Sequence, residues 1–404
     1  MEKLVIIGAG QAAIQCINSL KKESYSGEIT LVGEEEHLPY QRPPLSKGFL
    51  DDTVNKERLY FKKLEFYVEN HIQLKLGNKV QNVDLESERI LLSDQTELEF
   101  DRLIFATGSK VRRLKFPGDH LSSIHYLRGL DDAEAIKTDL NSCENLAVIG
   151  AGYIGLEVAA IAATKNINVT VIEMADRVMN RTVDPQISEY YLELHQKNGV
   201  KFKFNTSLKE IRGDDKPKYL ICSDLSEIKA DMVVIGAGII PNTDLAADAG
   251  IDTDNGILVD EFGQTNCEKI YACGDCTNHP NKILNKNLRL ESVHNAMEQS
   301  KTVAFNILNS PLEYNQVPWF WSDQYDHKLQ IVGLSGEHDT VTIRGEMSDN
   351  KFMLFYTKEN ELKAVDSINN PKEFLISRKL VEKKVKIDLD MISDPTTDLN
   401  DLIR

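Results

Sequence analysis

The chain contains 404 residues, enough for two or three domains of ordinary size. Hydrophobic residues make up 41% and charged residues 27%, which excludes a disordered, collagen-like or disulfide-scaffold protein. The 47 Lys and Arg residues against 63 Asp and Glu residues leave a formal net charge of −16. This surplus of acid disfavours nonspecific binding to nucleic acid or to an anionic membrane.

The cysteines and the apolar stretches indicate a cytoplasmic protein. Six cysteines are scattered through a chain too long to need disulfides, so we expect reduced thiols. Four apolar residues, Leu4–Ile7, precede Gly8, too few for the apolar region of a signal peptide. The longest apolar stretch, 146–163, is interrupted by three glycines and by Glu157, and it predicts a strand, a turn and a helix rather than a membrane span.

The chain begins with the pattern of a dinucleotide-binding fold. A β-branched run at 4–7 predicts a buried parallel strand, and the turn Gly8-Ala9-Gly10-Gln11-Ala12-Ala13 follows it directly. A helix to about residue 22 and a strand at 29–32 come next. Glu34 lies 34 − 13 = 21 residues beyond the turn, near the roughly 20 expected of a carboxylate that binds a ribose hydroxyl. Ala13 stands where a third glycine is usual.

The same pattern recurs in the middle of the chain. A strand at 146–149 precedes Gly150-Ala151-Gly152-Tyr153-Ile154-Gly155, a helix is expected from about residue 156, and a strand at 169–172 ends at Glu173. The acid lies 173 − 155 = 18 residues beyond the turn. In such a turn the first glycine permits the bend, the second lets the backbone approach a pyrophosphate, and the third lets helix pack on strand.

Two dinucleotide sites in one chain predict two cofactors that exchange electrons. A flavin and a nicotinamide are the natural pair, because hydride passes between them without a catalytic acid or base. Met174 and Ala175, not arginine, follow Glu173, so a 2′-phosphate would meet a carboxylate and NADH is favoured over NADPH. Arg177 and Arg181 lie close enough in sequence to leave NADPH open.

Further motifs carry a resemblance to a known family. The segments that carry it, besides the two glycine turns, are 38–47 (LPYQRPPLSK), 105–108 (FATG), 235–242 (IGAGIIPN), 270–275 (IYACGD), 289–293 (RLESV) and 318–324 (PWFWSDQ). In this order, over nearly the whole chain, they resemble the oxygenase-coupled, NADH-dependent ferredoxin reductases, the putidaredoxin reductase-like family of the pyridine nucleotide-disulfide oxidoreductase superfamily.

The resemblance implies an α/β fold with two Rossmann-like domains and a C-terminal α+β interface domain. The FAD domain is split by the inserted NAD domain. We expect the FAD domain at 1–111 and 245–317, the NAD domain at 112–244 and the interface domain at 318–404. In the last of these, segments at 329–333, 341–345 and 352–356 predict an antiparallel sheet.

The resemblance also assigns roles to residues. It implies that Lys47 and Glu157 form a buried or semi-buried pair beside the flavin, and that these two act in catalysis. Glu34 would bind the adenosine ribose, Asp275 a ribityl hydroxyl, and Trp321 would lie at the flavin edge where a ferredoxin docks. The further residues implied at FAD are Gly8, Gly10, Ala13, Arg42, Ala106, Thr107, Gly108, Gly274, Glu291, Ser292 and Val293. Those implied at NAD are Gly150, Gly152, Tyr153, Ile154, Gly155, Glu173, Gly236 and Gly238, and no metal site is assigned.

Several motifs have a plainer explanation. Arg42-Pro43-Pro44 is also typical of a rigid turn with a solvated arginine, and Glu157 of a carboxylate in a first helical turn. Cys273 and Cys276 have C-x-x-C spacing but fall inside a segment implied at FAD, so we expect structural thiols. Disulfide reductases of this fold carry two cysteines after the second strand, where 42–47 has none, so electrons are expected to leave the flavin directly.

The resulting hypothesis is an enzyme that passes electrons from NADH through FAD to a 2Fe-2S ferredoxin serving an oxygenase. An NADH oxidase or monodehydroascorbate-type reductase is an alternative, and a flavoprotein binding module resembling apoptosis-inducing factor is another. Because such ferredoxins are typically acidic, a chain of charge −16 needs a local basic patch for docking. The candidates are Lys110, Arg112, Arg113 and Lys115, or Lys282, Lys286 and Arg289.

Overall fold

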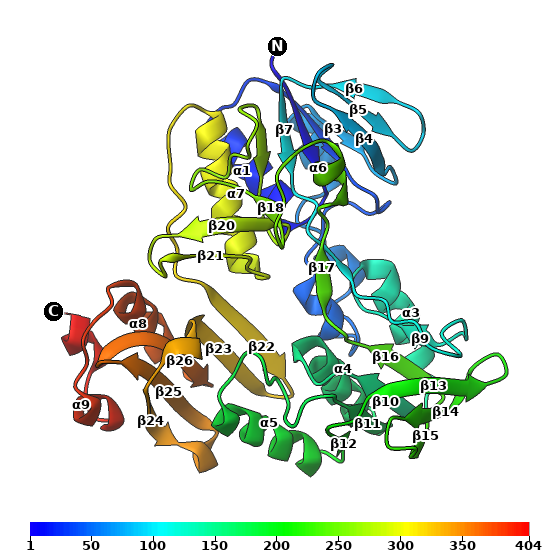
Figure 1. Cartoon of the computed structure of the whole chain (residues 1–404), viewed down its shortest axis with the longest axis vertical. Helices are drawn as coiled ribbons and strands as arrows, with labels where there is room; N and C mark the ends of the chain where they lie inside the picture. Colours follow the sequence, from blue (N-terminus) through cyan, green and yellow to red (C-terminus); the bar gives the residue numbers. More distant parts are fainter. Residues whose placement is uncertain (404) are drawn as a thin grey trace. The chain divides into compact units, whose positions relative to one another are not determined.

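The computed structural model describes residues 1–403, which fall into two units (Figure 1). The first unit comprises 1–41, 56–110 and 240–320, and the second comprises 42–55, 111–239 and the chain from Trp321 onward. Short strands β8 (Ser109–Val111) and β17 (Ile239–Pro241), at two of the crossings, pair with each other. The α/β class is confirmed, and the three domain boundaries stay a prediction.

A parallel sheet in the order β19-β7-β1-β2-β3 forms the centre of the first unit. The predicted strands at 4–7 and 29–32 correspond to β1, just before the first glycine turn, and β2, after the helix that follows the turn. Parallel strands of this kind are buried on both faces, which explains their β-branched composition. The bounds are β1 (Lys3–Ile7), β2 (Glu28–Val32), β3 (Ile72–Lys75), β7 (Arg102–Phe105) and β19 (Ile270–Ala272).

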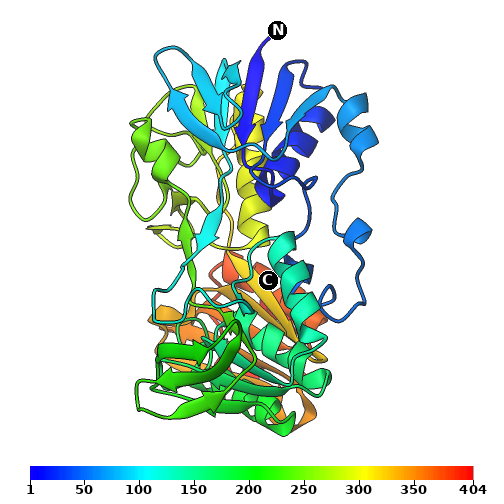
Figure 2. The same ribbon diagram turned by 90° about the vertical axis from the view of Figure 1, so that its right-hand side faces the viewer.

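Alternate residues of β1 face two different layers, because side chains along a strand alternate. Leu4 and Ile6 belong to the core that includes α1 (Gln11–Lys22) and α7 (Val293–Ile307). The two helices remain side by side in the view turned by 90° (Figure 2). Val5 and Ile7 pack in the core of an antiparallel meander. The meander and the smaller elements of this unit are β4 (Val80–Asp84), β5 (Arg89–Leu92), β6 (Glu97–Glu99), η2 (Lys56–Arg58), α2 (Leu64–Glu69), α6 (Asp244–Asp248), β18 (Ile257–Leu258), β20 (Thr277–Asn281) and β21 (Lys286–Leu288).

The second unit repeats this arrangement around the second glycine turn. Its parallel sheet has the order β12-β11-β10-β16-β9. Leu146 and Val148 belong to the core that contains helix α4, and Ala147 and Ile149 to the core that contains the meander β13-β14-β15. The bounds are β9 (Ile124–His125), α3 (Leu130–Leu140), β10 (Asn145–Ile149), α4 (Tyr153–Thr164), β11 (Asn168–Ile172), α5 (Pro185–Lys197), β12 (Lys201–Lys203), β13 (Leu208–Gly213), β14 (Pro217–Cys222), β15 (Glu227–Lys229) and β16 (Met232–Ile235).

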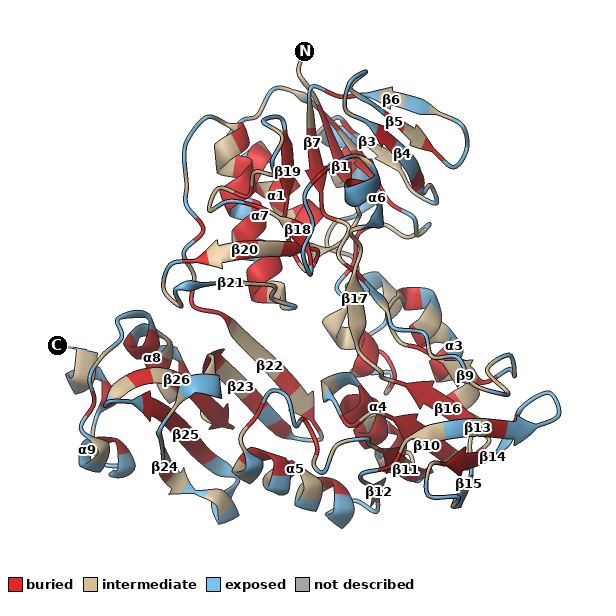
Figure 3. Ribbon diagram, viewed as in Figure 1, coloured by how far each residue is buried: buried red, intermediate tan, exposed pale blue. Residues whose placement is uncertain are grey.

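An antiparallel sheet in the order β22-β23-β26-β25-β24 follows. It contains the three strands predicted for the tail. The interior strand β25 is buried from Phe352 to Thr357 (Figure 3), which accounts for its nearly continuous apolar sequence. The bounds are β22 (Trp319–Gln324), β23 (His327–Gly333), η3 (Ser335–Glu337), β24 (Thr340–Glu346), η4 (Met347–Asp349), β25 (Lys351–Lys358), β26 (Glu361–Ile368), α8 (Pro371–Glu382), α9 (Leu389–Ser393) and η5 (Leu399–Ile403).

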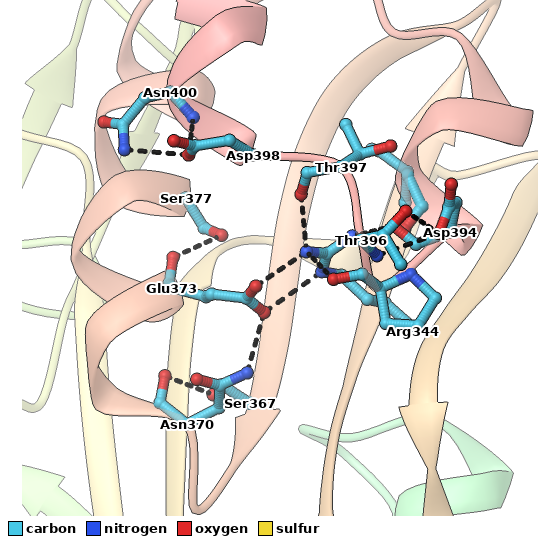
Figure 4. Close-up of polar contacts among 12 residues, drawn as sticks. Arg344, Ser367, Asn370, Glu373, Ser377, Asp394, Thr396, Thr397, Asp398 and Asn400 are labelled. Atoms are coloured by element: carbon cyan, nitrogen blue, oxygen red, sulfur yellow. Dashed lines mark hydrogen bonds and ion pairs between the residues drawn. The ribbon is translucent and has the colours of Figure 1, made fainter.

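A buried arginine holds the last segment of the chain to this sheet. Arg344, on β24, is only 3% exposed and makes two parallel hydrogen bonds to Glu373 on α8, of 3.0 and 2.7 Å. Its remaining N–H groups donate to carbonyl oxygens of the segment after α8 (Figure 4). These acceptors are the carbonyls of Ile392, Asp394, Pro395 and Thr397. The guanidinium therefore supplies donors that no apolar residue could replace.

Replacement of Arg344 by alanine should lower the free energy of unfolding by about 3 kcal/mol, because Glu373 loses its partner and several buried carbonyls lose their donor. Urea denaturation followed by tryptophan fluorescence measures this, since both tryptophans lie on β22. Lys358→Ala is the control, because Lys358 is half exposed and lies 3.9 Å from Glu337. It should change stability by less than about 0.5 kcal/mol. Equal midpoints for the two variants would contradict the structural role of Arg344.

A buried histidine in the first unit makes stability depend on pH. His279 on β20 is 1% exposed, packs edge-on against Tyr314, and neither ring nitrogen has a hydrogen-bond partner among residues 1–403. Burial lowers the pKa of His279 to about 4. The unfolded chain, with an ordinary pKa near 6.5, binds this proton more readily. Folding is therefore weakened as the pH falls from about 6.5 toward 4.

The variant His279→Leu should lose part of this acid sensitivity while costing little at pH 7, since no hydrogen bond is removed. Between pH 7 and pH 5 the native protein should lose roughly 2 kcal/mol from this group, at about 1.4 kcal/mol per pKa unit. Denaturation at both pH values measures the difference. The exposed His120 supplies the control His120→Leu, which should retain the acid sensitivity of the native protein.

Candidate functional site

The first glycine turn leaves backbone N–H groups open at the start of α1. Gly8 has a φ of +110°, and a Cβ atom there would overlap the carbonyl oxygen of Ala106, so no other residue fits. Gly10 is the N-cap of α1, no side chain caps it, and a Cβ on it would meet nothing within 4 Å. Ala13 is fully buried, which agrees with a packing role at the third position.

The second turn has the same construction. Gly150 has a φ of +101°, and a Cβ there would lie 2.5 Å from the carbonyl oxygen of Gly236. A Cβ on Gly155 would overlap the carbonyl oxygen of Gly150. Gly152 is the N-cap of α4, again without a side-chain cap and with open space where its Cβ would stand. The helix begins at Tyr153, earlier than predicted, because the glycine itself is the cap.

Both turns fit the pyrophosphate of a dinucleotide. Neither α1 nor α4 carries an acidic residue in its first turn. The N–H groups there bear partial positive charge and have no side-chain partner at the cap, so an oxyanion can accept from them. This opening at Gly10 and at Gly152 is the structural evidence that the two turns can hold FAD and NAD.

The two acids that follow the turns differ in their surroundings. Glu173 accepts a hydrogen bond of 2.7 Å from the N–H of Ala151 and one of 2.8 Å from the N–H of Ala175. Its carboxylate is therefore fixed beside the second turn, and each oxygen keeps a lone pair for a ribose hydroxyl. Glu34 is 72% exposed and lies 3.7 Å from Lys79. Within residues 1–403, no hydrogen bond ties the Glu34 carboxylate to the first turn, so its role at the adenosine ribose stays a prediction.

The two arginines near Glu173 are not equivalent. Arg177 donates to the carbonyl of Val183 and to the hydroxyl of Ser188, at 2.8 and 2.6 Å, and also to the carbonyl of Asn180. Its donors are thus occupied by the loop that it stabilises. Arg181 is exposed, and its Nη2 lies 3.9 Å from where a Cβ on Gly238 would stand.

Several of the residues expected at FAD lie beside the first sheet, whereas Arg42, Lys47 and Trp321 belong to the second unit. The Thr107 hydroxyl donates to the Asn242 carbonyl at 2.7 Å, and the Asn242 amide donates to the Thr107 carbonyl at 2.9 Å, which holds the Ala106-Thr107-Gly108 turn in place. Asp275 accepts from the Ser109 hydroxyl at 3.3 Å. A Cβ on the preceding Gly274 would lie 3.2 Å from the Cβ of Ala12, so Asp275 follows a backbone segment adjacent to the first glycine turn.

Helix α7 begins at Val293, one of the residues implied at FAD. Its N-cap Ser292 accepts a 3.1 Å hydrogen bond from the N–H of Asn295, and Glu291 forms an ion pair with Arg289. The α7 N-terminus therefore has a side-chain cap, unlike those of α1 and α4. Trp321 lies on β22, directly before the buried Ser322.

The predicted Lys47–Glu157 pair is present in the second unit. Glu157 on α4 is 2% exposed, and its Oε2 lies 2.7 Å from Lys47 Nζ and also accepts from the Ser46 hydroxyl. Its Oε1 accepts a 2.6 Å hydrogen bond from the Ser322 hydroxyl. Sequence reasoning missed both serines, although Ser46 adjoins Lys47 and Ser322 lies in a quoted motif. A carboxylate buried in this way needs such donors.

The rigid loop before Lys47 belongs to the same arrangement. The 3-10 turn η1 (Pro43–Ser46) follows Arg42, whose Nη1 donates to the carbonyl of Arg128 at 2.8 Å. Arg42 is therefore anchored to backbone and is not the solvated arginine of the plainer explanation. Lys47 Nζ also donates to the carbonyl of Pro43 at 3.2 Å, so the proline turn orients the ammonium group.

The C-x-x-C cysteines are buried thiols. Cys273 and Cys276 are both free and fully buried. Burial raises the pKa of Cys273 to about 12 and also raises the pKa of Cys276, so neither forms a reactive thiolate near neutral pH. The structural explanation agrees with these surroundings.

The candidate basic patches are largely neutralised by nearby acids. Lys110 pairs with Asp244, and Lys115 lies 3.3 Å from Asp119. Lys282 contacts both Glu261 and Glu313, and Arg289 pairs with Glu291.

Within residues 1–403, no group of three or more His, Cys, Asp or Glu side chains is arranged to bind a metal ion. No helix in the same range has the length and apolar character needed to cross a membrane.

The chain belongs to the pyridine nucleotide-disulphide oxidoreductases, whose family model matches residues 2–300. A second model, described as the reductase C-terminal domain, matches residues 319–403. These matches confirm the resemblance derived from the motifs.

Named relatives make the position within this family more specific. The chain is 40% identical over 397 residues to a rhodocoxin reductase of Rhodococcus erythropolis, which covers 98% of this chain and 93% of that protein. It matches the structure of the ferredoxin reductase for the CYP199A2 system from Rhodopseudomonas palustris with a TM-score of 0.97, at 36% identity and over 100% of both chains. It matches the reductase in the covalent putidaredoxin reductase–putidaredoxin complex with a TM-score of 0.96, at 35% identity, covering 100% of this chain and 98% of that one.

The openness of the second turn can be tested by Gly152→Ala. The added methyl has room and an allowed backbone conformation, so the protein should fold normally. It would occupy the space above the helix N-terminus and weaken NAD binding about tenfold, the loss of roughly one charge-assisted hydrogen bond. Titration calorimetry with NAD⁺ measures this. Gly336→Ala, also in open space but on η3, should bind NAD⁺ as the native protein does, and equal affinity of both variants would contradict the assignment.

Proposed function

We propose that this protein is an FAD-dependent NADH:ferredoxin reductase that supplies electrons to an oxygenase. Two observations on the chain support the proposal together: two open glycine turns, and a Lys47–Glu157 pair whose lysine lies on the segment where disulfide reductases carry cysteines. The relatives are named as a rhodocoxin reductase, as the ferredoxin reductase for the CYP199A2 system and as a putidaredoxin reductase, which supports a ferredoxin as the electron acceptor. The observation that carries the choice of a direct electron acceptor is that segment 42–47, which provides Lys47, contains no cysteine, so electrons have no thiol relay there.

The overall reaction is NADH plus two oxidised ferredoxins giving NAD⁺, two reduced ferredoxins and one proton. A bound flavin supplies the ability to take an electron pair and release single electrons. We assign FAD to the turn at Gly8 and Gly10, with Asp275 and the α7 N-terminus, and NAD to the turn at Gly150 and Gly152. The proposed domains remain 1–111 with 245–317, 112–244, and 318–404.

The chain's own residues position the reactants. Lys47 presents an ammonium group whose place is set by Glu157 and by the Pro43 carbonyl. In the family pattern this pair lies where nicotinamide and flavin meet, and the burial of Glu157 excludes water from the carboxylate. Trp321 is proposed at the edge from which the ferredoxin, a 2Fe-2S protein, takes its electrons.

We propose NADH as the preferred donor. Glu173 places a carboxylate where a 2′-phosphate would stand. The guanidinium of Arg177 is already hydrogen-bonded to the Val183 carbonyl and the Ser188 hydroxyl. Arg181 is the cation left exposed near Gly238. Six free cysteines fit a reducing compartment, and we propose the cytoplasm.

Steady-state assays separate this function from its alternatives. NADH-driven reduction of cytochrome c that requires added 2Fe-2S ferredoxin is the expected result. Equal turnover with oxygen or with ascorbyl radical would instead favour an oxidase or a monodehydroascorbate-type reductase. Absence of turnover with all three acceptors would favour a binding module.

The variant Glu173→Ala should reduce the preference for NADH over NADPH by tenfold or more, because it removes both the ribose acceptor and the repulsion of a 2′-phosphate. The ratio of kcat/KM for the two nucleotides, measured with ferricyanide, gives the preference. Glu189→Ala, an exposed acid on α5, is the control for the loss of one negative charge. An unchanged ratio in Glu173→Ala would contradict the assignment.

A further inference from the structure

A chain of hydrogen bonds extends from Glu157 into the C-terminal part of the second unit. The Ser322 hydroxyl lies 2.6 Å from Glu157 Oε1 and 3.2 Å from Gln324 Nε2. Gln324 Oε1 lies 2.8 Å from His195 Nε2, and His195 Nδ1 lies 3.3 Å from the Tyr325 hydroxyl. Ser322, Gln324 and His195 are each no more than 1% exposed. The chain joins helix α4, strand β22 and helix α5.

The carboxylate determines the direction of every bond in this chain. Ser322 has one hydroxyl proton, and Glu157 needs it because a carboxylate only accepts. The Ser322 oxygen must then accept from the amide group of Gln324, so the amide oxygen faces His195. That oxygen requires an N–H on His195 Nε2, and His195 Nδ1 accepts from Tyr325.

The protonation of His195 agrees with this order. Burial lowers the pKa of His195 to about 4, so the ring is neutral near pH 7 and carries a single N–H. With its N–H on Nε2, the ring fixes the amide of Gln324 in one of its two orientations. Within residues 1–403, the third hydrogen-bond contact of Gln324, besides those with Ser322 and His195, is with the Met179 sulfur at 3.9 Å.

We propose that Ser322, Gln324 and His195 are positioning residues that hold the Lys47–Glu157 pair in its working orientation. They donate one to the next, from His195 to Gln324 to Ser322, and Ser322 donates to Glu157 Oε1. Glu157 Oε2 is left for Lys47 and Ser46. Through Ser322 and Gln324, the C-terminal sheet thereby helps to orient Glu157 on α4, in addition to providing Trp321. The inference rests on the proposed function, because it assigns a purpose to the pair named there.

The substitution Gln324→Glu tests the direction of the bonds with almost no change of shape. An ionised carboxyl at this position cannot donate to Ser322, whereas a protonated one can donate to Ser322 and still accept from His195. The side chain at 324 contacts Ser322 and His195. Glu157 and Lys47 lie beyond the serine, and Tyr325 lies beyond the histidine. The rate of flavin reduction by NADH in anaerobic stopped flow should fall three- to tenfold at pH 8.5 and recover as the pH is lowered to 6.

Two further variants keep the test independent of folding. Gln324→Leu introduces no charge and removes the donor at every pH, so its rate should be reduced by the same factor at pH 6 and at pH 8.5. Gln196→Glu adds the same charge on the next residue of α5 after His195, exposed to solvent, and should follow the native pH profile. A Gln324→Glu rate that equals the native rate at pH 8.5, or one that fails to recover at pH 6, would overturn the proposal.

Histidine ¹⁵N spectroscopy of the flavin-loaded protein supplies a readout apart from turnover. His195 should show the Nε2–H tautomer, with no titration between pH 5.5 and 8.5, and this signature should be altered in Gln324→Leu. An Nδ1–H tautomer in the native protein would refute the bond order. Failure of the native protein to reduce its flavin with NADH would instead refute the proposed function, whatever the tautomer.

Discussion

The buried carboxylate of Glu157 is the constraint on which the second unit depends. A negative charge at 2% exposure is unfavourable unless donors surround it, and here three side chains provide them. They come from two segments far from α4 in sequence, the loop 42–55 and strand β22. This requirement gives a physical reason for the assignment of 42–55 to the second unit, although the segments on both sides of it belong to the first.

The two dinucleotide repeats use the same backbone solution with different supporting contacts. In each, a glycine at positive φ lies against a carbonyl of the neighbouring strand end, and a second glycine caps a helix without a side chain. The second repeat adds Glu173, whose carboxylate receives two backbone N–H groups beside its turn. The first repeat has no equivalent at Glu34, which lies exposed near Lys79. The carboxylate that follows the second turn is therefore held more firmly than the carboxylate that follows the first.

Ion pairs on the surface limit the positive charge that this acidic chain can offer to a ferredoxin. Most cations that the sequence offered as a docking patch are paired with carboxylates of the same unit, among them Lys110, Lys282 and Arg289. Such exposed pairs add little stability, but they reduce the positive potential that an acidic partner would meet. Association with a ferredoxin is therefore expected to depend more on apolar and shape complementarity than the charge pattern alone suggests.

The sequence by itself determined the α/β class, the two glycine turns with the strands that precede them, and three strands of the C-terminal sheet. These features depend on local chemistry: the backbone freedom of glycine, the alternation of apolar residues and the capping of helix ends. The sequence also predicted the Lys47–Glu157 pair, but only through resemblance. Only the tertiary structure brought Ser46, Ser322, Gln324 and His195 to that pair. It also bonded the Glu173 carboxylate to the N–H of Ala151 and engaged the N–H donors of Arg177 in hydrogen bonds. Such hydrogen bonds, several of them between residues more than a hundred positions apart, leave no periodic signal in the chain, because they depend on which faces the folded elements bury together.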